Sequence, residues 1–207
     1  MKIAIIGESK LALNLGNKFI SRSIDVVYGV GNDFELKDKH ISWKLANPSS
    51  SERFLTYKEA IDRADVLFLC CENDCYKEIC QLIGESSLPA KCIVDCTNSS
   101  YPKGFNYNIT MLKKHAKATK VFKAFSNLGL DYPSNDPLGL IKETYYCGEE
   151  CEEKLMLKKL IAQAGFNPID AGDFDSAMLL EAFYHLKIKI SASHTQKSGF
   201  DFKLISL

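Results

Sequence analysis

A short turn that could hold a phosphate follows the first apolar run of the chain. Ile3 to Ile6 lead into Gly7, and further small residues follow at Ser9 and Ala12. This spacing matches the glycine-rich turn of dinucleotide-binding units, whose small residues permit a tight turn, close approach to a pyrophosphate and close packing of helix on strand. A helix that begins here would also offer N–H groups and a positive dipole end to an anion. The residues predicted to bind a cofactor at this turn are Gly7, Glu8, Ser9, Lys10 and Leu11.

One glycine alone does not establish such a site, because many strand-turn-helix junctions contain one and bind nothing. The position of the turn favours binding, since a second apolar run, IDVVYGV at residues 24–30, follows at the usual distance. We expect the hydroxyl of Ser9 to offer a further donor and Lys10 to add a positive charge.

The end of this second run should indicate which dinucleotide is bound. An acidic side chain there binds the ribose hydroxyls of NAD, whereas a basic one accommodates the additional phosphate of NADP. The charged residues nearest in sequence, Asp33, Lys37 and Lys39, come late, so residue chemistry leaves the choice open. The residues predicted to face the adenosine are Val30, Gly31 and Asn32.

Apolar, β-branched runs alternate with helical patterns through the first three quarters of the chain. The apolar runs occupy residues 3–7, 24–30, 40–45, 66–71, 92–96, 119–125 and 144–148. The helical patterns occupy residues 10–22, 57–62, 75–83, 110–115 and 151–164. Strands that are apolar on every side and are separated by helices indicate a parallel sheet covered on both faces. We therefore predict an α/β fold of the Rossmann type, doubly wound around a mainly parallel sheet, with a short helical C-terminal extension.

The chain divides into two parts in this interpretation. Residues 1–172 form a dinucleotide-binding domain, and residues 173–207 form a helix at 176–189 and a tail that pack on it. The tail, SGFDFKLISL, is too apolar for a disordered end, so Phe200, Phe202, Leu204 and Ile205 should cover a surface.

Charge and composition exclude several classes of partner. Because 26 basic residues balance 26 acidic ones, no overall field would hold nucleic acid or an anionic membrane. No apolar stretch approaches the ~20 residues of a membrane helix, and no signal peptide is recognisable. The eight cysteines lie mostly in or beside apolar runs and form no C-x-x-C pair. We interpret them as buried, reduced thiols of a cytoplasmic protein, with no metal site.

Seven short motifs, taken in order, resemble those of a known family. Residues 7–13 resemble GxGNxGxxLA, 26–33 VxxGSRxP, 70–75 AVPWxA, 93–99 VVDxTNP, 123–129 KAFNTxG, 170–181 DAGxLxxARxLE and 200–204 DFAFKLL. This family comprises the soluble NADP oxidoreductases related to the archaeal deazaflavin-dependent NADP reductase. Its fold also forms the cytosolic domain of the six-transmembrane epithelial metalloreductases and is akin to the N-terminal domain of pyrroline-5-carboxylate reductase.

The resemblance implies an enzyme that uses NADP, with NAD as the alternative cofactor. Hydride would pass directly between the nicotinamide and a small acceptor such as a flavin or deazaflavin, so no catalytic side chain is assigned. The resemblance also implies a homodimer. We predict that the tail packs on the partner subunit as well as on its own chain and helps to close the acceptor pocket. The alternative is that the tail packs only on its own domain and completes the core. The middle of the dinucleotide is expected at Cys70, Cys71 and Glu72, and the nicotinamide at Thr97, Asn98, Ala124 and Phe125.

Three motifs depart from the family pattern. Val30 and Gly31 replace the serine and arginine that clasp the 2′-phosphate of NADP, so the bidentate partner is missing. Residues 72–73 replace a proline and an aromatic residue, and residues 126–127 replace an asparagine and a threonine. A dinucleotide-binding protein that has lost turnover, and serves as a redox sensor or partner subunit, therefore stays open as a second hypothesis.

Several of these residues have purely structural alternatives. Residues 97–99 could cap a helix or form a turn, and Lys123 could be a surface charge at a strand edge. Phe125 is expected to lie partly in the core. His185 falls on an apolar helix face, so we interpret it as a packing residue without a catalytic role.

Overall fold

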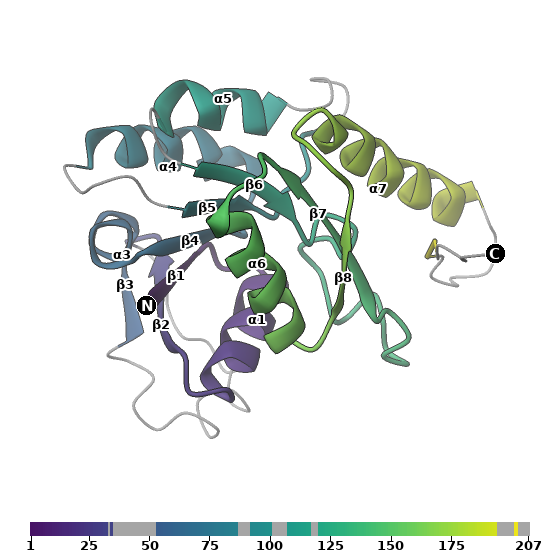
Figure 1. Ribbon diagram of the computed structural model, residues 1–207, viewed down its shortest axis with the longest axis horizontal. Helices are drawn as coiled ribbons and strands as arrows, with labels where there is room; N and C mark the ends of the chain where they lie inside the picture. The colour runs from purple at the N-terminus through teal and green to yellow at the C-terminus, as the bar shows by residue number, and fades with distance from the viewer. Residues whose placement is uncertain are drawn as a thin grey trace.

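The computed structural model describes residues 1–32, 34, 53–86, 92–100, 107–116, 120–193 and 201–202. Strand order in the sheet is β3-β2-β1-β4-β5-β6-β7-β8, with helices on both faces (Figure 1). The strands are β1 (Lys2–Ile6), β2 (Asp25–Val30), β3 (Phe54–Thr56), β4 (Val66–Leu69), β5 (Cys92–Asp95), β6 (Lys120–Ala124), β7 (Glu143–Gly148) and β8 (Asn167–Asp170). The helices are α1 (Lys10–Ile20), α3 (Tyr57–Arg63), α4 (Asn73–Glu85), α5 (Tyr107–Ala116), α6 (Glu152–Gln163) and α7 (Ser176–Ser193).

The first six strands run parallel, and the last two run the other way. Strand β7 pairs antiparallel with β6, and β8 pairs parallel with β7. The chain moves outward from β1 through β2 to β3, then returns to the other side of β1 and continues from β4. The predicted Rossmann-type, mainly parallel sheet is confirmed, and its switch point lies between β1 and β4.

Alternate side chains of the strands pack into two separate hydrophobic layers. Ile3 and Ile5 face a core that is completed by α1 and α6. Ala4 and Ile6 face the opposite core, which α3, α4, α5 and α7 complete. Because both faces are covered, a strand such as β4 is buried at every position, as its uninterrupted apolar run predicts.

Two described strands were not predicted from the sequence. Strand β3 has only three residues, and β8 begins with the exposed Asn167 and contains Pro168, so neither has a long apolar run. Both lie at edges of the sheet, where less of the strand is buried. The strand expected at residues 40–45 falls outside the described residues, as do Asp33, Lys37 and Lys39.

The C-terminal extension begins with α7, which runs four residues beyond its predicted end at residue 189. Of the tail, Asp201 and Phe202 are described, whereas Phe200, Leu204 and Ile205 fall outside the described residues. The ring of Phe202 lies 4.4 Å from that of Phe183 on α7, measured between centroids. This part of the tail therefore packs on its own chain.

No helix among the described residues combines the length and apolar character that crossing a membrane requires.

Candidate functional site

The predicted cofactor residues lie on turns that meet at one edge of the sheet. Strands β1, β2, β4, β5 and β6 are parallel, so their carboxyl ends face the same way (Figure 1). Ligands of open α/β sheets bind outside these carboxyl ends, at the switch point. The turns that follow the five strands therefore form the candidate site.

Gly7 begins the first turn with a φ of +123°, in a conformation that side chains rarely adopt. A Cβ atom at this position would lie 2.5 Å from the carbonyl oxygen of Cys70, on the turn after β4. The N–H of Gly7 donates to the carbonyl of Gly29 on β2, at 2.9 Å. Only glycine permits this close contact between the turns after β1 and β4.

Ser9 caps helix α1, and this role differs from the one predicted. Its hydroxyl oxygen accepts a hydrogen bond from the N–H of Ala12 at 3.1 Å, which is the usual N-cap interaction. The same hydroxyl donates to the carbonyl of Cys70 at 2.7 Å. Since its one hydrogen is already used, the expectation that Ser9 offers a hydroxyl donor to a phosphate is wrong for this structure.

The start of α1 is only partly open to an anion. The N–H of Leu11 donates to the carbonyl of Leu130 at 3.0 Å, and the Lys10 ammonium lies 3.7 Å from Asp131. The N–H groups of Ser9 and Lys10 make no hydrogen bond to any residue that the structure describes. These two groups are therefore the donors that α1 could offer to a pyrophosphate.

The second turn lies beside a cavity of about 600 Å³ that opens near the end of β2. Val30 is buried, whereas Gly31 and Asn32 line the cavity together with Glu8 from the first turn. The carboxylate of Glu8 accepts a hydrogen bond from the N–H of Gly31, at 2.9 Å. Three of the predicted residues from two turns thus meet at this cavity.

A thiol with altered acidity lines the same cavity. Cys75, in the first turn of α4, is partly exposed, in contrast to the burial predicted for the cysteines. A hydrogen bond from Cys71 lowers the pKa of Cys75, burial opposes this, and a hydrogen bond from Tyr57 adds to the lowering, so the pKa is about 7. Cys71 itself is buried, as is Cys70.

A chain of amide hydrogen bonds connects the turns after β4, β5 and β6. The Asn73 amide donates to the carbonyl of Asn98 at 3.1 Å, and the Asn98 amide donates to the carbonyl of Ser126 at 2.9 Å. Asn108 on α5 donates both to Asn73 at 2.6 Å and to Thr97 at 2.8 Å. These contacts fix the predicted nicotinamide residues relative to the middle turn.

Two buried polar atoms at this end have no hydrogen-bond partner among the described residues. They are Oδ1 of Asn98 and Oγ of Ser126. An unpartnered buried polar atom is unfavourable, and its presence calls for a ligand or a functional explanation. The neighbouring Ser99 has a structural role, as one alternative predicted, because its hydroxyl accepts from the N–H of Asn108 at the start of α5.

Lys123 is buried, so its interpretation as a surface charge is wrong. Its ammonium lies 2.9 Å from Asp95 on β5 and 2.8 Å from Glu181 on α7, and it donates to the carbonyl of Thr97 at 2.9 Å. All three charged side chains have no exposed surface. Burial lowers the pKa of Lys123, but the two carboxylates raise it more, and the net shift is upward.

Ala124 and Phe125 reach the edge of the sheet only through their backbone. Both side chains are fully buried, and the ring of Phe125 packs against Phe68 and Phe166. Phe125 therefore belongs to the core, and it adopts a positive φ of 61° where the chain leaves β6.

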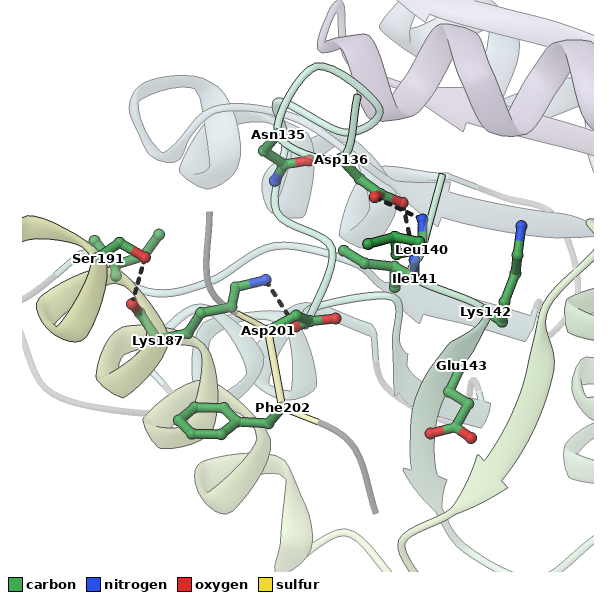
Figure 2. A pocket seen from close by; sticks show the side chains of 11 residues that line it. Asn135, Asp136, Leu140, Ile141, Lys142, Glu143, Lys187, Ser191, Asp201 and Phe202 are labelled. Atoms are coloured by element: carbon green, nitrogen blue, oxygen red, sulfur yellow. Dashed lines mark hydrogen bonds and ion pairs between the residues drawn. The ribbon is translucent and has the colours of Figure 1, made fainter. Parts of the chain in front are cut away.

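A second cavity of about 410 Å³ lies beyond the end of β6 (Figure 2). Since β7 runs antiparallel to β6, its first residue, Glu143, lies at the same edge as the carboxyl ends, and Lys142 precedes it. The other wall comes from α7 and the described part of the tail. There, the Lys187 ammonium lies 3.4 Å from the Asp201 carboxylate (Figure 2). Lys187 also donates to the carbonyl of Asn127 at 2.5 Å.

Sequence reasoning missed several residues of this site. It did not assign a role to Asn73, Asn108 or Ser126, and it did not connect Glu181 with Lys123. A usable signal was present for the last pair, because an isolated charge inside an apolar run needs a partner of opposite sign.

His185 contacts the candidate site without lying in either cavity. Its Nε2 atom is 2.9 Å from the carbonyl oxygen of Ser99. The Glu181 carboxylate, one turn earlier on α7, accepts from the N–H of Ser99 at 3.3 Å. Helix α7 thus holds the turn that follows β5 through both side chains, and this polar contact of His185 was not part of its interpretation as a packing residue.

Comparison with known proteins shows what this chain is similar to. Residues 2–99 match the model of the family described as NADP oxidoreductase, coenzyme F420-dependent. The chain is 25% identical over 184 residues to the metalloreductase STEAP3 of Rattus norvegicus, a match that covers 87% of this chain and 36% of that protein. The chain thus spans little more than a third of the length of this relative.

Solved structures share the fold over most of the chain. A putative F420-dependent NADP reductase from Arthrobacter sp. FB24 superposes with a TM-score of 0.80 at 17% identity, covering 100% of both chains. An imine reductase from Aspergillus terreus, solved with NADPH4, superposes with a TM-score of 0.64 at 14% identity, covering 92% of this chain and 61% of the other. Residues 2–99 of the chain therefore resemble the coenzyme F420-dependent NADP oxidoreductase family, and the chain shares the fold of these solved structures.

Proposed function

We propose that the protein is an oxidoreductase that transfers hydride between NADP, or alternatively NAD, and a small acceptor such as a flavin or deazaflavin. One observation carries this proposal. Hydrogen bonds connect the turns after β4, β5 and β6, and they end at two unpartnered buried oxygens, those of Asn98 and Ser126. Such atoms fit the carboxamide of a nicotinamide, which both donates and accepts hydrogen bonds.

The residues present suit each part of a dinucleotide. The cavity beside Glu8 and Gly31 would take the adenosine. The N–H groups of Ser9 and Lys10, at the positive end of α1, would take the pyrophosphate. This order follows the edge of the sheet from β2 to β6.

The acceptor would bind in the cavity beyond β6 (Figure 2). This cavity adjoins the turn that carries Ser126, because its lining residue Lys187 bonds to the neighbouring Asn127. Phe202 supplies part of its apolar wall, in accord with the role expected for the tail.

The nicotinamide supplies the hydride chemistry, and the protein supplies position and exclusion of water. Asn98 and Ser126 would orient the carboxamide and thereby the face of the ring that reacts. The buried ion pairs of Lys123 hold the β5 turn, at the carbonyl of Thr97, in the position that this contact requires.

Mixing the purified protein with NADPH or NADH and a panel of flavins and deazaflavins tests the proposal. We expect oxidation of the dinucleotide and a loss of about tenfold in kcat/KM for Ser126→Ala, the size of one positioning hydrogen bond. Ser21→Ala is the matched control, since Ser21 is exposed at the far end of α1. Binding without turnover would favour the sensor or partner-subunit hypothesis, and absence of binding would refute the proposal.

We also propose that the protein is a cytoplasmic homodimer, built from a dinucleotide-binding domain of residues 1–172 and an extension of residues 173–207. Helix α7 supports the dimer because it exposes large apolar side chains at Met178, Leu179, Leu186 and Ile188. Light scattering of the full chain measures whether it forms a dimer. Light scattering and the reductase rate of a chain ending at Ser198 measure whether the tail contributes to the dimer or to activity. A monomeric full chain would exclude the dimer, and an unchanged, fully active dimer after truncation would exclude a role for the tail.

A further inference from the structure

The carboxylate that the second turn lacks comes from the first turn. Strands β1 and β2 are in parallel register, with Ile6 opposite Gly29, so Glu8 and Gly31 are also opposite each other beyond the strand ends. The Glu8 carboxylate accepts from the N–H of Gly31 at 2.9 Å. An acidic group therefore stands at the end of β2, although it is 23 residues away in sequence.

The described charges around this group are mainly negative. Glu78 on α4 lines the same cavity, and so does Lys58 on α3. The Lys58 ammonium is already paired with Asp62, at 3.0 Å. Among the residues that the structure describes, this lining also holds the Cys75 thiol, whose pKa of about 7 adds further negative charge near neutral pH.

These groups act oppositely on the two dinucleotides. A ribose with free 2′- and 3′-hydroxyls can donate hydrogen bonds to a carboxylate. A 2′-phosphate carries negative charge, so the carboxylate repels it and also occupies the N–H of Gly31 that the phosphate would use.

We propose that Glu8 sets the cofactor preference of this protein, by favouring the ribose of NADH and opposing the 2′-phosphate of NADPH. This inference rests on the proposed function, because it concerns the adenosine end of the same site. It makes Glu8 a specificity-determining residue, with an effect opposite to that of the arginine which the family pattern places after β2.

Calorimetric titration with NADH and NADPH, and with the fragments ADP and 2′,5′-ADP, tests the inference. Glu8→Gln removes the charge but keeps an oxygen that can accept from Gly31. We expect this variant to shift the ratio of affinities toward the phosphorylated ligands by about tenfold or more. Glu78→Gln is the matched control, because it removes the same charge from the same cavity without touching Gly31, and its shift should stay below about twofold.

Circular dichroism and thermal melting confirm that both variants are folded. If wild type binds both dinucleotides and Glu8→Gln leaves their ratio unchanged, the inference is overturned and the proposed function stands. An equal shift in Glu78→Gln also overturns it, since the cavity charge as a whole would then act. If wild type binds neither dinucleotide nor either fragment, the inference and the proposed function fail together.

Discussion

Replacing Lys123 by methionine tests how much the buried charges contribute to stability. The variant keeps most of the side-chain volume but leaves Asp95 and Glu181 as two buried carboxylates without their cation. Removing one partner of a buried ion pair costs about 3–5 kcal/mol. For a chain of this size each kcal/mol lowers the melting temperature by about 2–4 °C, so we expect a decrease of roughly 6–20 °C. Thermal unfolding followed by circular dichroism measures it.

Two further variants isolate the cause. Lys120→Met, on the same strand, removes an ion pair of the same length with Glu149, but this pair is exposed and should contribute less than about 1 kcal/mol. Adding Glu181→Gln to Lys123→Met removes one of the orphaned charges, so the double variant should be more stable than the sum of the single effects. A Lys123→Met protein that melts within about 2 °C of wild type would refute the reasoning.

Three more predictions follow from the edge of the sheet. Gly7→Ala should lower the free energy of unfolding by about 1–3 kcal/mol or more and weaken dinucleotide binding in calorimetry, because alanine is strained at this φ and its Cβ would strike backbone. Gly139→Ala is the control, since Gly139 also has a positive φ but open space around it, and this variant should lose less free energy of unfolding. Gly31→Arg should raise the preference for NADPH over NADH by about 1–3 kcal/mol in the same titrations, and an unchanged ratio would exclude a phosphate at this turn. The rate at which iodoacetamide alkylates Cys75, measured by mass spectrometry, should rise with pH and reach half its maximum near pH 7. In Cys71→Ala this midpoint should move to higher pH, because Cys71 stabilises the thiolate that reacts.

The fold could be predicted from the sequence because its signal is local. A strand such as β4 is apolar at each position, and this follows from burial on both faces. Strands β3 and β8 could not be predicted, since they are short edge strands that pairing with a neighbour stabilises more than their own side chains do.

The location of the site could be predicted from the sequence, but the hydrogen bonds of its residues could not. Once the strands are placed, their carboxyl ends must lie together, which locates the turns. Whether a given donor on a turn is free depends on contacts across the sheet. Ser9 illustrates this, because its hydroxyl is taken by a carbonyl 61 residues away.

The contacts of charged side chains across the sheet also could not be predicted from the sequence. Glu8 could be placed beside Gly31 only after the register of β1 and β2 was known. Lys123 required knowledge of two partners, 28 and 58 residues distant. In each case the residue type was visible in the sequence, but its partner was set by topology.

At the end of β5, the same side chains belong to the core and hold the candidate site. Lys123 joins β6, β5 and α7 in the core, and the same ammonium holds the carbonyl of Thr97 on the turn proposed to meet the nicotinamide. Glu181 and His185 bind the next backbone groups of this turn, at Ser99. Since all these contacts come from β6 and α7, undocking of α7 would release the turn as well as expose apolar surface. The C-terminal extension therefore stabilises the geometry of the candidate site directly, and a loss of its packing should reduce cofactor binding before the sheet itself unfolds.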